Sequence, residues 1–133
     1  MKVLLCVDDN NGMLFNHRRV SSDRAVTEKV NEIADGRLFI TEFSRKLFPD
    51  ARIIEEEGVR ELGQVDYFFL ENVSLASIVD MVSELIVFRW NRRYPSDFCL
   101  DIVPEETYIM VSTEDFVGNS HDRITMEVWR YED

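Results

Sequence analysis

The sequence predicts a single α/β domain over residues 1–133, built on a mostly parallel mixed sheet that is flanked by helices and ends in an antiparallel hairpin. A length of 133 residues suits one domain with one core. The run KVLLCV at 2–7 is almost wholly apolar, as expected of a strand buried on both faces of a parallel sheet. Strand and helix patterns then alternate, which is typical of right-handed crossovers between parallel strands. Two consecutive strand patterns in the last third predict the hairpin.

The first half of the chain supplies one long helix and several shorter elements. From 22 to 34 apolar residues recur at i, i+4 and i+7, which predicts a helix with one buried face. Ser21 or Ser22 can cap its start, and Gly36 suits its end. The elements expected next are a strand at 37–41, a short helix at 42–48, a strand at 51–54 and a helical turn or loop at 55–63.

The second half begins with a strong strand pattern, VDYFFLE, at 65–71. Ser74 can cap a following helix, whose inward residues would be Leu75, Ile78, Val79 and Val82. A strand at 84–89 comes next, and the strands of the hairpin are expected at 107–113 and 123–131. The last of these alternates apolar and polar residues, as in an antiparallel strand with one wetter face.

Composition and charge exclude several functional classes. The chain has 26 acidic and 15 basic residues and a net charge of −11, which disfavours general binding to nucleic acid or to an anionic membrane surface. The start, MKVLLCVDD, is too short and too soon charged for a signal peptide, so we expect a cytoplasmic protein. Cys6 and Cys99 each lie in an apolar run, which predicts two buried thiols in preference to a disulfide or a metal pair.

Arginine is concentrated in two stretches, NGMLFNHRRVSSDR at 11–24 and FRWNRRYPSDF at 88–98. The planar guanidinium group suits bidentate binding of carboxylate or phosphate, so the stretches predict a pocket for an anionic small molecule. The predicted ligand-binding residues are Arg18, Arg19, Ser21, Ser22, Arg24, Arg92, Arg93 and Trp90. Ordinary ion pairing with the many acidic residues explains the same pattern, and the sequence alone leaves both interpretations open.

The candidates for proton transfer are Asp23, at the start of the predicted long helix, and His17, beside the first arginines. His121 lies in the polar loop of the hairpin and is interpreted as a solvated residue. Asp8 and Asp9 belong to DDNNG, which has turn chemistry, and we assign no metal site. Whether the protein is an enzyme, and whether it holds a cofactor, stays open at this point.

The stretch VDDNNGM at 7–13 resembles the dihydrofolate reductase superfamily, whose first strand is followed by Val-Asp, three residues and Gly-Met. The later strand and helix segments and the C-terminal hairpin are similar to that family too. The resemblance implies a reductase-like fold, with Asp23 near the place of the family's substrate-binding carboxylate. The chain is divergent, because LENVSL replaces the family's glycine run and Thr41 and Glu42 replace its Gly-Arg. These missing cofactor motifs predict that classical NADPH binding is lost.

Two further resemblances compete with this one. VLLCVDDN resembles the first strand of response-regulator receiver domains, which implies a Mg²⁺ site at Asp8 and Asp9, with Glu71 as third ligand. NHRRVSSDR and WNRRYPSD are similar to stretches in small uncharacterised bacterial proteins, some of which carry a ribonuclease Z label. Such a nuclease needs a histidine-rich dizinc site, whereas this chain has only His17 and His121.

The sequence therefore predicts a protein of dihydrofolate reductase-like fold that has lost its dinucleotide site and binds an anionic small molecule through its arginines. The alternative is a non-catalytic interaction protein whose arginine and aromatic loops pair with an acidic partner or with a second copy in a homo-oligomer. A degenerate receiver-like domain with a magnesium site is the minor alternative.

Overall fold

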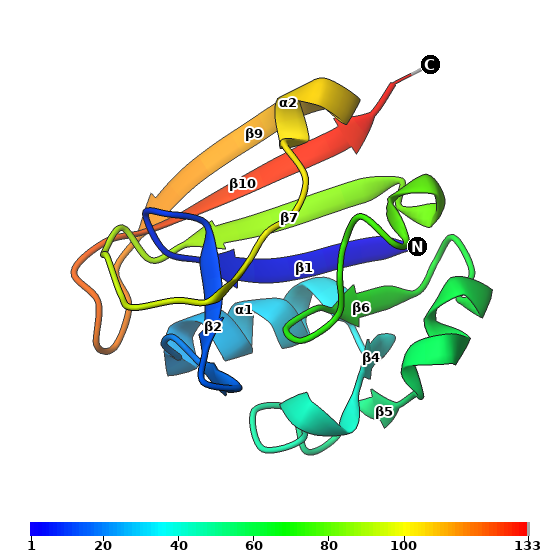
Figure 1. The fold of residues 1–133 in the computed structure, drawn as a ribbon, viewed down its shortest axis with the longest axis horizontal. Coiled ribbons are helices and arrows are strands. Elements are labelled where there is room, and N and C mark those ends of the chain that lie inside the picture. Colours follow the sequence, from blue (N-terminus) through cyan, green and yellow to red (C-terminus); the bar gives the residue numbers. More distant parts are fainter. Residues whose placement is uncertain (133) are drawn as a thin grey trace.

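The structure is a computed structural model that describes residues 1–132, which fold around a seven-stranded sheet with the strand order β5-β4-β6-β1-β7-β10-β9 (Figure 1). The strands are β1 (Lys2–Val7), β4 (Leu38–Ile40), β5 (Arg52–Ile53), β6 (Tyr67–Phe69), β7 (Glu84–Arg89), β9 (Tyr108–Phe116) and β10 (Ile124–Tyr131). β1 pairs in parallel with β6 and β7, whereas β10 is antiparallel to β7 and β9. The predicted parallel sheet with its antiparallel C-terminal hairpin is confirmed.

The central strand β1 is buried on both faces, as its apolar sequence predicts. Val3 and Leu5 belong to the core on one side of the sheet, and Leu4 belongs to the core on the other side. All three side chains have no exposed surface. Because the strand has no solvated face, polar residues first appear where it ends, at Asp8 and Asp9.

Helix α1 (Arg24–Ala34) covers one face of the sheet and presents Val26, Val30 and Ala34 to its core. The expected helix is therefore confirmed. The N-cap is Asp23, not Ser21 or Ser22 as expected, and its carboxylate accepts the main-chain N–H of Ala25. Asp35, with φ 48°, forms the left-handed C-cap just before Gly36.

The helix expected after Ser74 is wrong. The chain there forms turns and one 3₁₀ helix, η3 (Val79–Met81), although Leu75, Ile78 and Val82 are buried as predicted. Asp101 explains the difference, because its carboxylate accepts both the hydroxyl of Ser74 and the main-chain N–H of Ala76. The short helix expected at 42–48 is likewise reduced to η1 (Glu42–Ser44), and the helical turn expected at 55–63 is η2 (Glu56–Glu61).

A second, three-stranded sheet with the order β3-β2-β8 was not predicted. It consists of β2 (Gly12–Phe15), β3 (Arg18–Arg19) and β8 (Phe98–Cys99), and a four-residue helix α2 (Pro104–Thr107) follows it. Asn16 and His17, with φ 50° and 63°, make the left-handed turn that joins β2 to β3. This turn folds the first arginine pair back along β2, with Arg19 opposite Leu14 and Arg18 opposite Phe15.

The two cysteines do not share one environment. Cys6 is half-buried on β1, but Cys99 is exposed on β8, so the prediction of two buried thiols is wrong for Cys99. Both thiols are free. Within residues 1–132, no helix has the length and apolar character needed to cross a membrane.

Candidate active site

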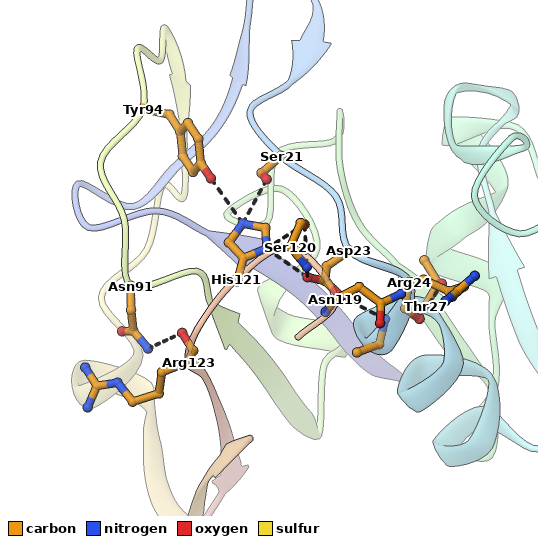
Figure 2. Close-up of polar contacts among 11 residues, drawn as sticks. Ser21, Asp23, Arg24, Thr27, Asn91, Tyr94, Asn119, Ser120, His121 and Arg123 are labelled. Atoms are coloured by element: carbon orange, nitrogen blue, oxygen red, sulfur yellow. Dashed lines mark hydrogen bonds and ion pairs between the residues drawn. The ribbon is translucent and has the colours of Figure 1, made fainter. Parts of the chain in front are cut away.

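The carboxylate of Asp23 is the most densely hydrogen-bonded group of the site (Figure 2). It accepts the main-chain N–H groups of Ala25, Asn119 and Ser120, each at 2.9 Å. It also lies 2.9 Å from Nδ1 of His121. These contacts join the start of α1 to the loop between β9 and β10, a connection that the sequence analysis did not predict.

Two opposing effects determine the ionisation of Asp23. Burial disfavours the charged form and by itself would raise the pKa. The N–H groups of Asn119, Ser120 and Ala25, together with His121, favour the carboxylate more strongly, so the pKa of Asp23 lies well below its ordinary value of 3.8. Asp23 is therefore a buried anion whose lone pairs are already used inside the protein.

His121 is buried, not solvated as the sequence analysis expected, with only 4% of its surface exposed. Its ring stacks on Trp90, with 4.6 Å between ring centroids. Nε2 lies 3.0 Å from the hydroxyl oxygen of Ser21 and 3.1 Å from that of Tyr94. Figure 2 shows both hydroxyls converging on the same edge of the imidazole. Ser21, His121 and Asp23 thus form a continuous chain of hydrogen bonds.

Arg19 and Glu71 form the second polar pair of the site. Nε and Nη2 of Arg19 each lie 2.9 Å from a carboxylate oxygen of Glu71, so the pair is bidentate. The hydroxyl of Ser44 donates to the same carboxylate at 2.7 Å. The hydrogen bond to Glu71 outweighs the burial of Arg19 and raises the pKa of its guanidinium. Glu71, which the sequence analysis considered as a departure from a glycine run and as a third magnesium ligand, is therefore the counter-ion of Arg19.

A narrow cavity of about 20 Å³ lies between these two polar pairs, large enough for about one water-sized group. Arg19, Ser21, Asp23, Glu71 and Trp90 supply polar groups or ring surface to its wall. The remaining lining residues are Cys6, Met13, Ser22, Val26, Thr27, Leu47, Phe69 and Leu70. Burial, followed by the charge of Glu71, raises the pKa of the Cys6 thiol, which makes it a poor nucleophile.

Two wider grooves open beside this cavity. The larger, of about 740 Å³, is lined by His17, Arg18, Arg19, Glu42, Phe43, Arg45, Lys46 and Pro49, and we call it the basic groove. The smaller, of about 270 Å³, is lined by Ser22, Asp23, Arg24, Thr27, Lys46 and Leu47. Lys46 lines both grooves, and Arg19 lines both the basic groove and the narrow cavity.

The structure brings the first arginine stretch together and leaves the second apart. Arg18 and Arg19 share the basic groove, and Ser21, Ser22 and Arg24 line the narrow cavity or the smaller groove. Arg92 and Arg93 are exposed in the loop after β7 and line none of these three spaces. Trp90 is 2% exposed and lines only the narrow cavity.

The two predicted proton-transfer residues lie in different places. His17 is exposed at the turn between β2 and β3 and lines the basic groove, whereas Asp23 is buried beside His121. The sequence places His121 in the hairpin loop, but a single histidine in a loop forms no pattern from which its burial could be predicted. Ser44 was not singled out, and Tyr94 was noted only as an aromatic residue beside the second arginine stretch, because each contacts a site residue 27 positions away in the sequence.

Two of the three residues that the receiver resemblance implies as magnesium ligands, Asp8 and Glu71, have other partners. Oδ1 of Asp8 accepts the N–H groups of Asn10 and Gly12, which confirms the turn interpretation, and Oδ2 accepts that of Tyr94. Glu71 pairs with Arg19. Across residues 1–132, no group of three or more His, Cys, Asp or Glu side chains is placed to hold a metal ion. The receiver-like alternative thus lacks the ligand geometry that it requires.

Comparison with known proteins identifies the fold. No protein-family model matches the chain, and no curated protein sequence does so at a significant level. Among solved structures, the chain is similar to a dihydrofolate reductase from Enterococcus faecalis complexed with NADP(H) and RAB-propyl, with a TM-score of 0.73. The match covers 100% of this chain and 97% of that chain at 8% identity. The chain therefore has a dihydrofolate reductase-like α/β fold, and at this identity the likeness extends to the fold alone.

Proposed function

We propose that this protein binds a small anionic molecule in the basic groove and does so without the NADPH site of classical dihydrofolate reductases. One observation supports this most directly. Four cationic side chains, Arg18, Arg19, Arg45 and Lys46, line one groove with a single acid, Glu42, in a chain of net charge −11. Such a local excess of positive charge attracts anions and raises their local concentration.

Ion pairing inside the protein accounts for only half of these cations. Arg19 pairs with Glu71, and Nη1 of Arg45 lies 3.0 Å from Oε1 of Glu42. Arg18 and Lys46 form no ion pair with any of the residues that the structure describes. Both are exposed and line the same groove, so they are available to a phosphate or carboxylate group of a ligand.

Three features speak against a pyrophosphate at a helix N-terminus. The N-terminus of α1 already holds the carboxylate of Asp23. The first turn of the four-residue α2 contains Glu105 and Glu106, which repel an anion. The stretch LENVSL after β6 forms turns, and its Glu71 is occupied by Arg19. These features support the proposal that NADPH does not bind in the classical manner.

A thermal-shift screen with inorganic phosphate, pyrophosphate, sugar phosphates, nucleotides, folates and NADPH tests the proposal. A ligand that binds only the folded state raises the unfolding midpoint by mass action. We expect a saturable rise with at least one small anion and none with NADPH. The double variant Arg18→Ala/Lys46→Ala should lose that rise while keeping its own midpoint, because neither side chain has an ion-pair partner within residues 1–132.

The matched control is Arg37→Ala/Arg130→Ala, which removes the same charge from exposed positions outside the three spaces. It should keep the ligand-dependent rise. A third variant, Arg92→Ala/Arg93→Ala, tests the second arginine stretch. If this variant loses the ligand-dependent rise in unfolding midpoint, the anion binds at that stretch instead. No rise with any anion would contradict the proposal and favour the interaction protein, whose arginine loops would then be tested by partner capture.

A further inference from the structure

We propose that Ser21, His121 and Asp23 form a Ser-His-Asp triad that makes Ser21 a nucleophile toward esters of small carboxylic acids. This activity goes beyond anion binding and does not depend on it. The proposal starts from connectivity, since Ser21 Oγ lies 3.0 Å from Nε2 of His121 and Nδ1 of the same ring lies 2.9 Å from Asp23. Nucleophile, base and orienting carboxylate are thus within hydrogen-bond reach in the order that acyl transfer requires.

The carboxylate determines which nitrogen of His121 is free to act. A carboxylate can only accept, so Nδ1 must donate its proton to Asp23. In the neutral ring Nε2 then carries the lone pair and can take the proton of Ser21. Asp23 is in turn held by the N–H groups of Asn119 and Ser120, so the ring is oriented by a group that is itself rigidly bound.

Ser21 lies in the irregular connection between β3 and α1, two residues before the N-cap Asp23. The main-chain N–H of Ser22, the next residue, makes no hydrogen bond within residues 1–132. It is therefore available to stabilise an oxyanion, the part that this N–H has in serine hydrolases.

The surroundings limit the substrate to a small acyl group. Ser21 is half-buried and lines the narrow cavity of about 20 Å³. The lining includes the apolar side chains of Met13, Leu47 and Phe69, and Trp90 stacks on the ring of His121. Because the cavity holds about one water-sized group, it matches the methyl group of an acetyl ester. The polar leaving group would lie toward the adjoining grooves, with which the cavity shares Arg19 and Ser22.

The reaction needs only the ester and water. Ser21 Oγ forms a bond to the carbonyl carbon while its proton passes to Nε2 of His121. The carbon–oxygen bond to the leaving alcohol then breaks, and Nε2 returns the proton to that alcohol, which leaves an acyl-Ser21 ester. Water adds to this ester and gives a proton to Nε2. The acyl–Oγ bond then breaks while Nε2 gives this proton to Oγ, which releases the carboxylic acid and restores the hydroxyl of Ser21 and the neutral ring of His121.

Tyr94 shares Nε2 with Ser21, since its hydroxyl lies 3.1 Å from the same nitrogen. The neutral nitrogen has one lone pair, so the two hydroxyls compete for it. Tyr94→Phe removes the competitor, and we expect Ser21 to remain reactive in that variant. An adduct on Tyr94 in place of Ser21 would show that the tyrosine, not the serine, is activated, and would overturn the proposal.

The test uses two reagents on the intact protein, an alkyl fluorophosphonate and p-nitrophenyl acetate, with adducts located by tandem mass spectrometry. We expect one adduct, on Ser21, and slow turnover of p-nitrophenyl acetate. Ser21→Ala should abolish both the adduct and the turnover of p-nitrophenyl acetate. The variant should fold normally, because it loses a single half-buried hydroxyl. His121→Asn keeps a donor for Asp23 but removes Nε2, so labelling should fall about 100-fold or more.

Ser112 is the control, because it is an exposed serine of β9. Ser112→Ala should label as the wild type does, and Ser112 itself should stay unmodified. The triad is refuted if neither reagent modifies Ser21, if Ser112 reacts as fast as Ser21, or if folded His121→Asn labels at the wild-type rate. Circular dichroism of each variant separates loss of the base from loss of the fold.

Discussion

Replacing Asp23 with alanine should lower the free energy of unfolding by about 4 kcal/mol. The substitution removes the N-cap of α1 and leaves the N–H groups of Asn119, Ser120 and Ala25 without their acceptor. It also leaves His121 buried without a partner for Nδ1. Each lost cap or buried hydrogen bond costs about 1–2 kcal/mol, and the exposure of Asn119 and Ser120 lets water recover part of the loss.

Urea unfolding measures this loss, and Asp122→Ala is its matched control. Asp122 is an exposed aspartate next to His121, in the same loop. It forms no ion pair with any residue from 1 to 132. Its replacement should change the stability by less than about 0.5 kcal/mol. Equal, small effects of the two substitutions would mean that the loop between β9 and β10 does not depend on Asp23.

The contribution of Asp23 should also disappear in acid. Its pKa in the folded state lies below the ordinary value of 3.8, because the N–H groups around it outweigh the effect of burial. A carboxyl group with a lowered folded-state pKa gives its full stability above the unfolded pKa and loses it as the pH falls toward the folded value. The stability difference between wild type and Asp23→Ala should therefore be constant above about pH 5 and shrink below about pH 4. Urea titrations at several pH values check this, and a difference that grows in acid would contradict it.

The sequence predicted those parts of the fold that local periodicity encodes. β1 alternates between two cores and α1 has one apolar face, and each pattern has only one reasonable structural solution. The small sheet escaped prediction because β3 and β8 have two residues each, too few to show a period. The helix expected after Ser74 failed for a different reason, since its competitor, Asp101, lies 27 residues away from Ser74.

Only part of the candidate site was predictable from the sequence, again because partners that are far apart in the sequence leave no local pattern. Asp23 was identifiable because it lies at the start of the predicted helix and near the place that the dihydrofolate reductase resemblance gives to a substrate-binding carboxylate. Its partner His121 is 98 residues away and Glu71 is 52 residues from Arg19, so no local pattern joins either pair. One sequence shows that arginines gather, but not which of them find a carboxylate. Only the folded chain distinguishes Arg19, which has a buried partner, from its neighbour Arg18, which has none among residues 1–132.

Replacing Arg19 with alanine should destabilise the protein by about 3 kcal/mol. The side chain of Glu71 is only 10% exposed, and without Arg19 its charge would keep Ser44 as its one side-chain donor among the residues that the structure describes. Removing one member of a buried ion pair costs more than the pair contributes, because the other charge stays buried. Arg19 also contacts the ring of Phe43 and its carbonyl oxygen, so packing is lost along with the charge.

Arg18→Ala is the natural control for this measurement. It removes the same side chain from the next position of the same strand, but Arg18 is exposed and unpaired within residues 1–132, so its loss should cost less than about 0.5 kcal/mol. The double variant Arg19→Met/Glu71→Leu should recover most of the stability lost in Arg19→Ala, since apolar side chains of similar size replace a buried pair at little cost. A double-mutant cycle with both single variants gives the coupling energy.

The outcome also assigns a role to Arg19, which lines both the narrow cavity and the basic groove. A large loss of stability with restored folding in the double variant means that Arg19 holds Glu71 and forms the wall between the two spaces. Arg18 and Lys46 would then be the cations left for an anionic ligand. Unchanged stability together with lost anion binding would instead mean that the guanidinium leaves Glu71 for the ligand, and the ion pair would be a resting state of the binding site.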